Sequence, residues 1–213
     1  MTRESHCFLR GRTAHRSGAV MDERALARAA RDGDEDAFAD LVRRHSGGLH
    51  RSVARIVLDD EEAWDVVQMA FIKAWQRLDK YDPRWSFSTW LYRIGTNLAI
   101  DLVRSRASRN KAHKAGGEQQ LRLVGGKDET STRMESSEVD GILRELVLVL
   151  TPQQRSAFIL REVEDLETSE VAKILGCSAA TVRNHVFQAR KTLRDEIRDR
   201  YPEFVPEIKR GRK

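Results

Sequence analysis

The sequence contains few of the residues that define disulfide-rich, low-complexity or membrane proteins. Among 213 residues it has two cysteines, Cys7 and Cys177, four prolines and 13 glycines. The two cysteines exclude a disulfide scaffold and a cysteine-based metal site, and they fit a protein of the reducing cytoplasm. The low glycine and proline content excludes a collagen-like chain. The most apolar stretch, residues 143–150, is far shorter than the roughly 20 residues of a membrane-spanning helix.

The motifs of the common enzyme classes are also missing. The chain has no glycine-rich phosphate loop, no nucleophile elbow and no paired metal-ligand motif. Its histidines are scattered, and we expect His45, His50, His113 and His185 on helix surfaces. The sequence therefore predicts a protein that is not an enzyme, that needs no metal or cofactor, and that acts by binding other macromolecules.

Charge is abundant and unevenly distributed. Charged residues make up 33% of the chain and the formal net charge is +5, whereas an average globular protein has about 25% charged residues. Residues 22–82 carry 14 acidic and 10 basic side chains, but residues 84–114 carry seven Lys or Arg and one acid, Asp101. Such a one-sided segment favours a polyanionic partner. The alternative is a solvated helix end that leads into a linker.

Hydrophobic periodicity predicts helices along most of the chain and gives no strand signal. A short amphipathic helix is expected at 22–31, and apolar residues continue at helical spacing over 38–57. Gly47-Gly48 lies inside that second segment and is expected to weaken it, by about 1 kcal/mol per glycine relative to alanine. Residues 59–62 supply four carboxylates at the start of the next helix, where the helix dipole favours them.

Two further helices complete the first half. The first has a buried stripe that steps by three or four residues: Trp64, Val67, Phe71, Ala74 and Leu78. Pro83 ends this helix, and a serine of the segment 86–88 can cap the next one. The expected buried face of that next helix consists of Leu91, Ile94, Leu98 and Leu102.

The chain is predicted to form two small all-α domains joined by a flexible linker. Periodicity is lost over a Gly- and Ser-containing stretch and resumes after it, where Thr151-Pro152-Gln153-Gln154 has the pattern of a capping box with proline at the first helical position. The predicted divisions are a disordered leader (1–21), a first domain (22–108), the linker (109–138), a second domain (139–200) and a basic tail (201–213).

Residues 170–190 have the pattern of a helix-turn-helix. Gly176 permits the turn and Ser178 can cap the second helix. On that helix, Arg183 and Asn184 suit base edges in a major groove, and Lys191 suits a phosphate. The expected DNA-contacting residues are Ser178, Ala180, Thr181, Arg183, Asn184, His185, Arg190 and Lys191. An ordinary helical hairpin with a basic surface is the alternative.

Aromatic residues are concentrated in one segment. Eight of the fourteen lie within residues 64–92, and we expect Trp64 and Trp90 in the core. Trp85 and Phe87 follow a proline and adjoin the basic segment, so they are harder to bury. Aromatic rings among arginines suit single-stranded nucleic acid, because bases stack on the rings while phosphates meet the cations. Packing within the domain is an equally good explanation for these two residues.

Two sets of motifs resemble regions 2 and 4 of the bacterial sigma-70 superfamily. The region 2 motifs are DVVQMAFIKAW at 65–75 and FSTWLYRIGTN at 87–97. The region 4 motifs are LTPQQR at 150–155, LRE at 160–162, TVR at 181–183 and AR at 189–190. The resemblance covers about residues 22–108 and 139–200, in the order of the family, and is strongest to the extracytoplasmic-function (ECF) group.

The resemblance implies a sigma factor, which binds core RNA polymerase, directs it to −35 and −10 promoter elements and helps to melt the −10 element. One region 2 helix would dock on the clamp helices of the largest polymerase subunit through Asp65, Gln68, Met69, Ile72 and Gln76. The melted −10 strand, with a flipped base, would be held by Trp85, Phe87, Arg93, Asn97 and Arg104. Region 4 would place its recognition helix in the −35 major groove.

The same resemblance implies further partners. They are the β flap of the polymerase and an anti-sigma factor that holds the free chain, and the implied location is the cytoplasm. The outer face of the −10-binding helix would include Ile100 beside the polar residues.

The sequence departs from the family at three places. Glu167 stands where many members have a Ser or Thr cap, although Thr168 could shift the cap by one residue. Asn184-His185 replaces a frequent Ser-Arg, so the −35 preference of better-known members does not transfer. Gly95 replaces a more usual alanine and should loosen its helix slightly.

A stand-alone regulator of the LuxR-like type is the alternative function, since residues 181–186 also resemble that group. Residues 58–108 argue against it, because a repressor needs neither an aromatic melting loop nor a polymerase-docking helix. Tight DNA binding in the absence of polymerase would discriminate between the two.

Overall fold

The computed structural model describes residues 22–115 and 138–202. Within these two ranges it contains eight α-helices and no β-strand, so the all-α prediction is confirmed. None of the described helices is long and apolar enough to cross a membrane. The predicted leader, most of the predicted linker and nearly all of the predicted tail lie outside the described residues.

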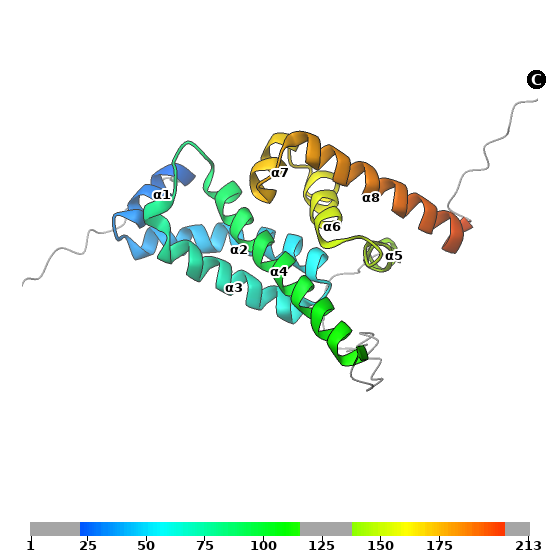
Figure 1. Ribbon diagram of the computed structural model, residues 1–213. Helices are drawn as coiled ribbons and strands as arrows, with labels where there is room; N and C mark the ends of the chain where they lie inside the picture. The colour runs from blue at the N-terminus through cyan, green and yellow to red at the C-terminus, as the bar shows by residue number, and fades with distance from the viewer. Residues whose placement is uncertain (1–21, 116–137, 203–213) are drawn as a thin grey trace, which may run out of the picture.

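The first four helices form what we call the N-terminal bundle (Figure 1). They are α1 (Glu23–Arg31), α2 (Glu35–Val57), α3 (Asp60–Gln76) and α4 (Phe87–Ala115), with a 3-10 turn, η1 (Leu78–Lys80), between the last two. α2 packs against each of the other three helices, and α3 packs against α4. Their apolar faces share one core, which includes Leu26, Leu41, Leu49, Phe71 and Leu91.

Side-chain caps fix where these helices begin. Asp34 and Asp59 accept hydrogen bonds from backbone N–H groups three residues later, at 3.0 and 2.9 Å. The Ser86 hydroxyl accepts from the backbone N–H of Thr89 at 3.1 Å, which confirms the predicted serine cap. Each bond satisfies an N–H group that the first turn of a helix leaves without an intrahelical partner.

α2 and α4 approach each other closely at two glycines. A Cβ atom at Gly48 would lie 2.9 Å from the Tyr92 hydroxyl oxygen, and one at Gly95 would lie 2.8 Å from a methyl carbon of Leu49. Both distances are below van der Waals contact, so the absence of a side chain permits the packing. The expected weakening at Gly47-Gly48 produces no break, because α2 runs unbroken through both residues.

The buried face of α3 is rotated slightly from the predicted stripe. Four of the five stripe residues are buried: Val67, Phe71, Ala74 and Leu78. Ala63 and Ala70 are fully buried beside them. Trp64 is 43% exposed and stacks on the His50 ring at a centroid distance of 4.0 Å, so its prediction as a core residue is wrong. The small alanines let α2 pack along a line that leaves Trp64 at its edge.

α4 is longer than predicted, because it continues to Ala115 instead of ending at Ser108. The residues from Arg109 to Ala115 include neither Gly nor Pro, so the backbone chemistry does not stop the helix there. Leu91 on its predicted buried face is fully buried. The other three predicted residues, Ile94, Leu98 and Leu102, are partly buried against the same core.

The remaining helices form the C-terminal bundle. They are α5 (Glu138–Val147), α6 (Pro152–Phe158), α7 (Thr168–Leu175) and α8 (Ala179–Arg200), and a π-helical turn, η2 (Ile159–Val163), continues α6. The predicted capping box is present, since the Thr151 hydroxyl accepts from the Gln154 backbone N–H at 3.3 Å and the Gln154 side chain accepts from the Thr151 backbone N–H at 3.1 Å.

α7 and α8 form the predicted helix-turn-helix. Gly176 ends α7 in the left-handed region, with φ of +65°, as its predicted role in the turn requires. The Ser178 hydroxyl accepts from the Thr181 backbone N–H at 3.0 Å and so caps α8. Glu167 occupies the cap position of α7 without a side-chain cap bond, and Thr168 is already helical. The predicted shift of that cap to Thr168 is therefore wrong.

The two bundles pack against each other as well as being connected through the linker. α7 lies on α4, and α6 contacts both α2 and α4 (Figure 1). Leu58 and Tyr92 of the N-terminal bundle pack against apolar clusters of the C-terminal bundle. Arg55 Nη1 and Glu164 Oε1 form an ion pair at 2.9 Å across the interface. The predicted tether thus joins two units that share a surface.

Arg155 is the buried charge of this interface. Its guanidinium donates to the carbonyl oxygens of Val147 at 2.9 Å and of Ile56, in the last turn of α2, at 2.8 Å. Weaker contacts reach the carbonyls of Leu148 and Leu150. Burial lowers the pKa of Arg155 to about 10, so the group stays cationic at neutral pH and depends on these acceptors for solvation.

Candidate nucleic-acid interface

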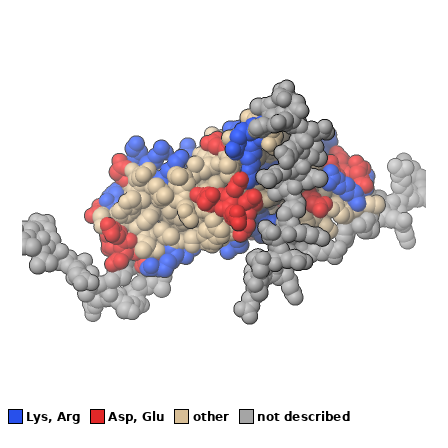
Figure 2. Space-filling model, turned by 90° about the horizontal axis from the view of Figure 1, so that it is seen from below, with Lys and Arg blue, Asp and Glu red and all other residues tan. Residues whose placement is uncertain are grey.

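The predicted docking residues form one exposed strip on α3. We call the set Asp65, Gln68, Met69, Ile72 and Gln76 the docking strip, and all five side chains are exposed. Met69 is 45% exposed and Ile72 is 50% exposed. Seen from below, the side on which α3 lies in Figure 1, the molecule shows a broad uncharged area beside a group of acidic side chains (Figure 2).

Two tryptophans border the docking strip and were not predicted to belong to it. Trp64 and Trp75 are 43% and 40% exposed. The sequence placed Trp64 in the core and offered no role for Trp75. Exposed tryptophan and methionine are typical of the centres of protein interfaces, so this face of α3 has the character of a surface that a protein partner covers.

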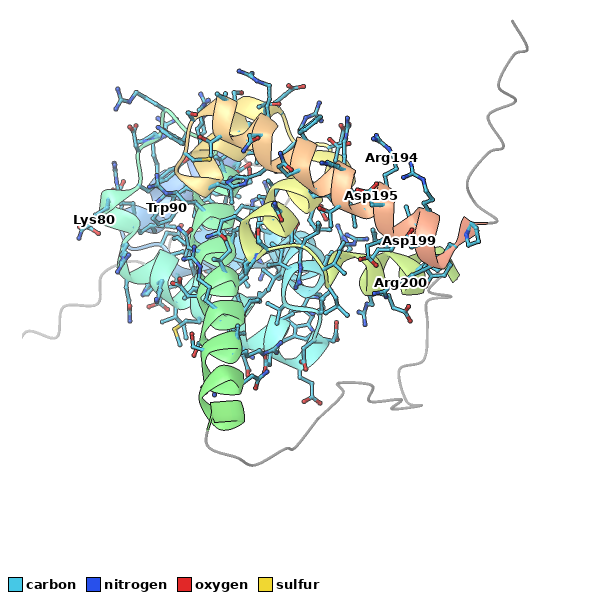
Figure 3. The ribbon with its side chains drawn as sticks, turned by 45° about the vertical axis from the view of Figure 1, so that its right-hand side comes forward. Lys80, Trp90, Arg194, Asp195, Asp199 and Arg200 are labelled. Carbon is cyan, nitrogen blue, oxygen red and sulfur yellow. The ribbon has the colours of Figure 1, made fainter. Side chains whose placement is uncertain are left out.

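A groove with basic walls runs between the end of α3 and α4. It encloses about 400 Å³, and its lining includes Lys73, Arg77, Lys80, Trp90, Arg93 and Asn97. We call it the basic groove. Figure 3 shows Lys80 and Trp90 near each other at this end of the molecule. Of the predicted −10 residues, Arg93 and Asn97 line this groove.

Sequence reasoning missed three cations of the groove, which lie on α3, at the residue after it and on η1. Lys73, Arg77 and Lys80 recur at intervals of four and three residues, which is the signal that could have placed them on one helical face. Trp90 was expected in the core, but it is only partly buried and lines the groove. The groove therefore combines cations with an accessible ring.

Phe87 does not belong to the exposed site, so its prediction as a −10 contact is wrong. It is fully buried as the first residue of α4. Its ring lies 5.7 Å from that of His45 and 5.9 Å from that of Tyr81, centroid to centroid. The beginning of α4 is directed into the bundle by α1 and α2, and this places Phe87 inside while Trp85 stays at the surface.

Trp85 lies in the loop between η1 and α4 and is partly buried. Lys173 of α7 places its Nζ 5.0 Å from the centroid of the Trp85 ring. Next to Trp85, Arg84 pairs with Asp82 at 2.6 Å and holds the pKa of that carboxyl below its usual range. The Trp85 ring thus lies beside α7 of the C-terminal bundle.

The outer face of α4 is directed toward the C-terminal bundle. Arg93, Asn97 and Arg104 are exposed, but Ile100 is buried and not on a free surface as expected. A second hollow, of about 370 Å³, lies between the bundles, and its lining includes Asn97, Arg104, Gln153, Cys177 and His185. In this conformation the predicted −10 face and the beginning of α8 therefore share a cavity.

The predicted −35 residues divide into three groups on α8. Ala180, Arg183, Asn184 and Lys191 are exposed, as direct contact with DNA requires. Ser178 is exposed and caps the helix, while Thr181 and His185 are partly buried. Arg190 is exposed and is ion-paired with Glu162 of η2.

One exposed apolar residue on α8 was missed. Phe187 is 63% exposed and lies one turn after Arg183. A large apolar side chain so exposed on a basic helix is the signal that could have identified it. The second half of α8 alternates charges instead, and Arg194, Asp195, Asp199 and Arg200 project from it in Figure 3.

The described residues contain no group of three or more His, Cys, Asp or Glu that could hold a metal ion. The free thiol of Cys177 lies in the hollow between the bundles, and burial raises its pKa.

Comparison with protein families matches two parts of the chain. Residues 41–109 match the family described as sigma-70 region 2, and residues 140–193 match sigma-70, region 4. The ECF RNA polymerase sigma factor SigW of Bacillus subtilis is 32% identical over 172 residues, which span 78% of this chain and 92% of SigW. The RNA polymerase sigma factor NccH of Alcaligenes xylosoxydans xylosoxydans is 34% identical over 80% of this chain and 92% of its own.

Solved structures show the same fold. CnrH, solved in complex with the cytosolic domain of CnrY, superposes with a TM-score of 0.62 at 27% identity and covers 84% of this chain and 98% of its own. The sigma factor RpoE of Bartonella quintana, solved with the anti-sigma factor NepR, superposes with a TM-score of 0.59 at 20% identity over 76% of this chain and 96% of its own.

Proposed function

Since the chain belongs to the ECF group of the sigma-70 family of RNA polymerase sigma factors, we propose a role in transcription initiation for each surface described above. The chain is a sigma factor that binds core RNA polymerase and promoter DNA. The proposal concerns which residues carry out docking, strand opening and −35 recognition. We also propose that the protein acts by binding alone, without covalent chemistry, and that it does so in the cytoplasm.

The docking strip on α3 is the proposed contact with the clamp helices of the polymerase. Met69 and Ile72 are apolar and half exposed, and Asp65, Gln68 and Gln76 surround them with hydrogen-bonding groups. An apolar centre within a polar rim is the usual anatomy of a protein interface. The strip lies on a helix whose opposite face is packed into the core, so it is presented rigidly.

The basic groove and Trp85 are the proposed site for the melted −10 strand. Lys73, Arg77, Lys80 and Arg93 provide cations along the groove, and Trp90 is the ring in it. Asn97 offers both a donor and an acceptor to a base edge. Stacking on an aromatic side chain is worth about 1–3 kcal/mol per base, which offsets the few kcal/mol needed to flip a base out of the duplex. The juxtaposition of four cations and the Trp90 ring in this groove is the observation that carries the assignment.

α8 is the proposed recognition helix for the −35 element. Its first two turns expose Arg183 and Asn184, which suit guanine and adenine edges, and Lys191 lies further along where a phosphate would pass. Phe187 is added to this face on the basis of its exposure. Arg190 joins it only after release from Glu162, with which it is paired in this conformation.

The packed arrangement cannot read both promoter elements at once. The −35 and −10 elements are separated by about 25 base pairs, which is roughly 85 Å of B-form DNA at 3.4 Å per base pair. Here α7 covers Trp85, and His185 shares a hollow with Asn97. We therefore assign this conformation to the free chain, and the two bundles separate on the promoter.

An anti-sigma factor is the proposed partner of the free chain. CnrH, a relative with the same fold, was solved with the cytosolic domain of CnrY bound to it. A partner that holds the bundles together would keep the −10 face beside the C-terminal bundle, with Asn97 and His185 lining the same hollow. The β flap of the polymerase is the proposed partner of the C-terminal bundle after separation.

The function is tested by transcription with purified core polymerase, this protein and a fragmented bacterial genomic library. Discrete start sites that require the protein would support the proposal and reveal the −35 and −10 sequences together. Tight duplex binding by the protein alone, with no polymerase association, would instead favour the LuxR-like regulator. None of the family matches and relatives reported above supports that alternative.

A further inference from the structure

The first turn of α4 lacks an acidic residue of its own. The positive end of a helix dipole and its unpaired N–H groups favour a carboxylate at this position, yet residues 87–90 are Phe, Ser, Thr and Trp. The carboxylate comes from a different helix. Glu23, the first residue of α1, accepts a hydrogen bond from the backbone N–H of Ser88 through Oε1 at 2.7 Å.

The loop before α4 is held at a second point, two residues before the helix begins. The Tyr81 hydroxyl donates to the carbonyl oxygen of Trp85 at 2.8 Å. Tyr81 is only 3% exposed, and its ring lies against those of Phe87 and Trp90, at centroid distances of 5.9 and 5.4 Å. Two partly buried hydrogen bonds therefore hold the backbone on both sides of Ser86.

Glu23 and Tyr81 belong to one local electrostatic environment. Burial raises the pKa of Tyr81, and the nearby charge of Glu23 raises it further. His45 places Nε2 3.7 Å from Oε1 of Glu23. The pKa of His45 is lowered, mainly by burial, so the ring is neutral near pH 7 and leaves the carboxylate of Glu23 free to bind the helix end.

We propose that Glu23 and Tyr81 are positioning residues for strand opening: they hold the loop 82–86 so that Trp85 and the basic groove are already arranged when an unpaired base arrives. Neither residue lines the groove. A site whose backbone is ordered in advance loses less conformational entropy when it binds. The inference rests on the proposed role of this loop in holding the −10 strand.

Under this proposal, α1 supports the loop before α4. Leu26, Ala27 and Ala30 anchor the helix in the core of the N-terminal bundle, so its first residue is held at a fixed place beside α4. α1 therefore both covers the core of the N-terminal bundle and holds the loop 82–86 in place.

The test compares Glu23→Ala, Glu23→Gln and Tyr81→Phe in the full chain with core polymerase. Glu35→Ala is the matched control, since Glu35 is an exposed acid in the first turn of α2, which has its own cap in Asp34. We expect Glu23→Ala to slow promoter opening roughly five- to ten-fold, if the stability that a helix cap typically contributes is lost from the opening step, with polymerase binding unchanged. Glu23→Gln keeps an acceptor oxygen and should recover part of the rate.

Amide hydrogen exchange gives a readout that a general loss of stability would not mimic. Peptides covering residues 82–90 should exchange faster in Glu23→Ala and in Tyr81→Phe, while peptides of α2 and α3 stay as in the unchanged chain. Normal opening by both Glu23→Ala and Tyr81→Phe would overturn the positioning role. Normal opening by Trp85→Ala would overturn the proposed function of the loop itself, which separates the two failures.

Discussion

The ammonium group of Lys173 lies 5.0 Å from the centre of the Trp85 ring, across the boundary between the two bundles. A cation over an indole face is a favourable contact, and it occupies the surface on which we expect a base to stack. A base and Lys173 would compete for this face of the ring. Under the proposed role of Trp85 in holding the −10 strand, we expect base capture on that face to be favoured when the C-terminal bundle leaves α4.

The first prediction concerns the ion pair that links the bundles. Arg55→Glu places two acids at the position of the 2.9 Å contact with Glu164 and should raise the separated fraction roughly two- to five-fold, as expected for a partly exposed pair worth about 1 kcal/mol or less. Energy transfer between dyes on α3 and α8 measures that fraction. Arg55→Glu combined with Glu164→Arg should restore the packed state, and failure of the double variant to do so would contradict the role of this pair.

Asn97→Ala should prevent opening of the −10 element while leaving polymerase binding intact. The side chain is exposed on α4 and lines the basic groove, so its loss removes a polar contact to a base edge and not a part of the core. We expect opening, followed with a fluorescent base at the −10 element, to slow at least ten-fold. Arg109→Ala, further along the same helix and also exposed, is the control. Opening at the normal rate in Asn97→Ala would show that another face reads the base.

Ile72→Asp should weaken binding to core polymerase at least ten-fold, because it places a charge at the centre of the docking strip. The residue is 50% exposed, so the fold should tolerate the change, and circular dichroism can verify that. Phe187→Asp is the matched control, since Phe187 is an apolar residue on α8 that is also largely exposed, at 63%. It should reduce −35 binding and spare polymerase binding. Equal loss of polymerase binding in both variants would contradict the assignment of the strip.

Two substitutions on α8 distinguish a base contact from a phosphate contact. Arg183→Ala should weaken −35 binding by about 1–3 kcal/mol and relax the sequence preference at one position. Lys191→Ala should weaken binding to all sequences alike and reduce its salt dependence. Measurement of binding across single-base variants of the −35 element separates the two patterns. An unchanged sequence preference in Arg183→Ala would show that Arg183 contacts a phosphate and not a base.

Much of this arrangement could be predicted, because it depends on local chemistry. The capping box at Thr151, the turn at Gly176 and the cap at Ser178 are short-range patterns, and each is found where the sequence places it. The exposed strip on α3 follows from helical periodicity in the same way. The family resemblance then supplied roles that no pattern of polarity could provide.

The errors arise where distant segments meet. Phe87 and Trp64 were misplaced because burial depends on which neighbouring helix covers which side. Ile100 is buried by a packing of α4 against the C-terminal bundle that periodicity within α4 does not contain. The bond from Ser88 to Glu23 spans 65 residues, so no local motif announces it.

The contacts of Arg155 link the equilibrium between packed and separated bundles to the binding of polymerase and promoter. In the packed form its guanidinium satisfies the Ile56 carbonyl at the end of α2, and in the separated form water must replace that bond. If polymerase and promoter bind only the separated form, their apparent affinity equals the intrinsic affinity multiplied by the fraction of chains in that form. Each 1.4 kcal/mol of free energy that favours the packed form lowers this apparent affinity about ten-fold. Under the proposed separation of the bundles, the bond from Arg155 to Ile56 would thus contribute to how much of the protein is needed to start transcription.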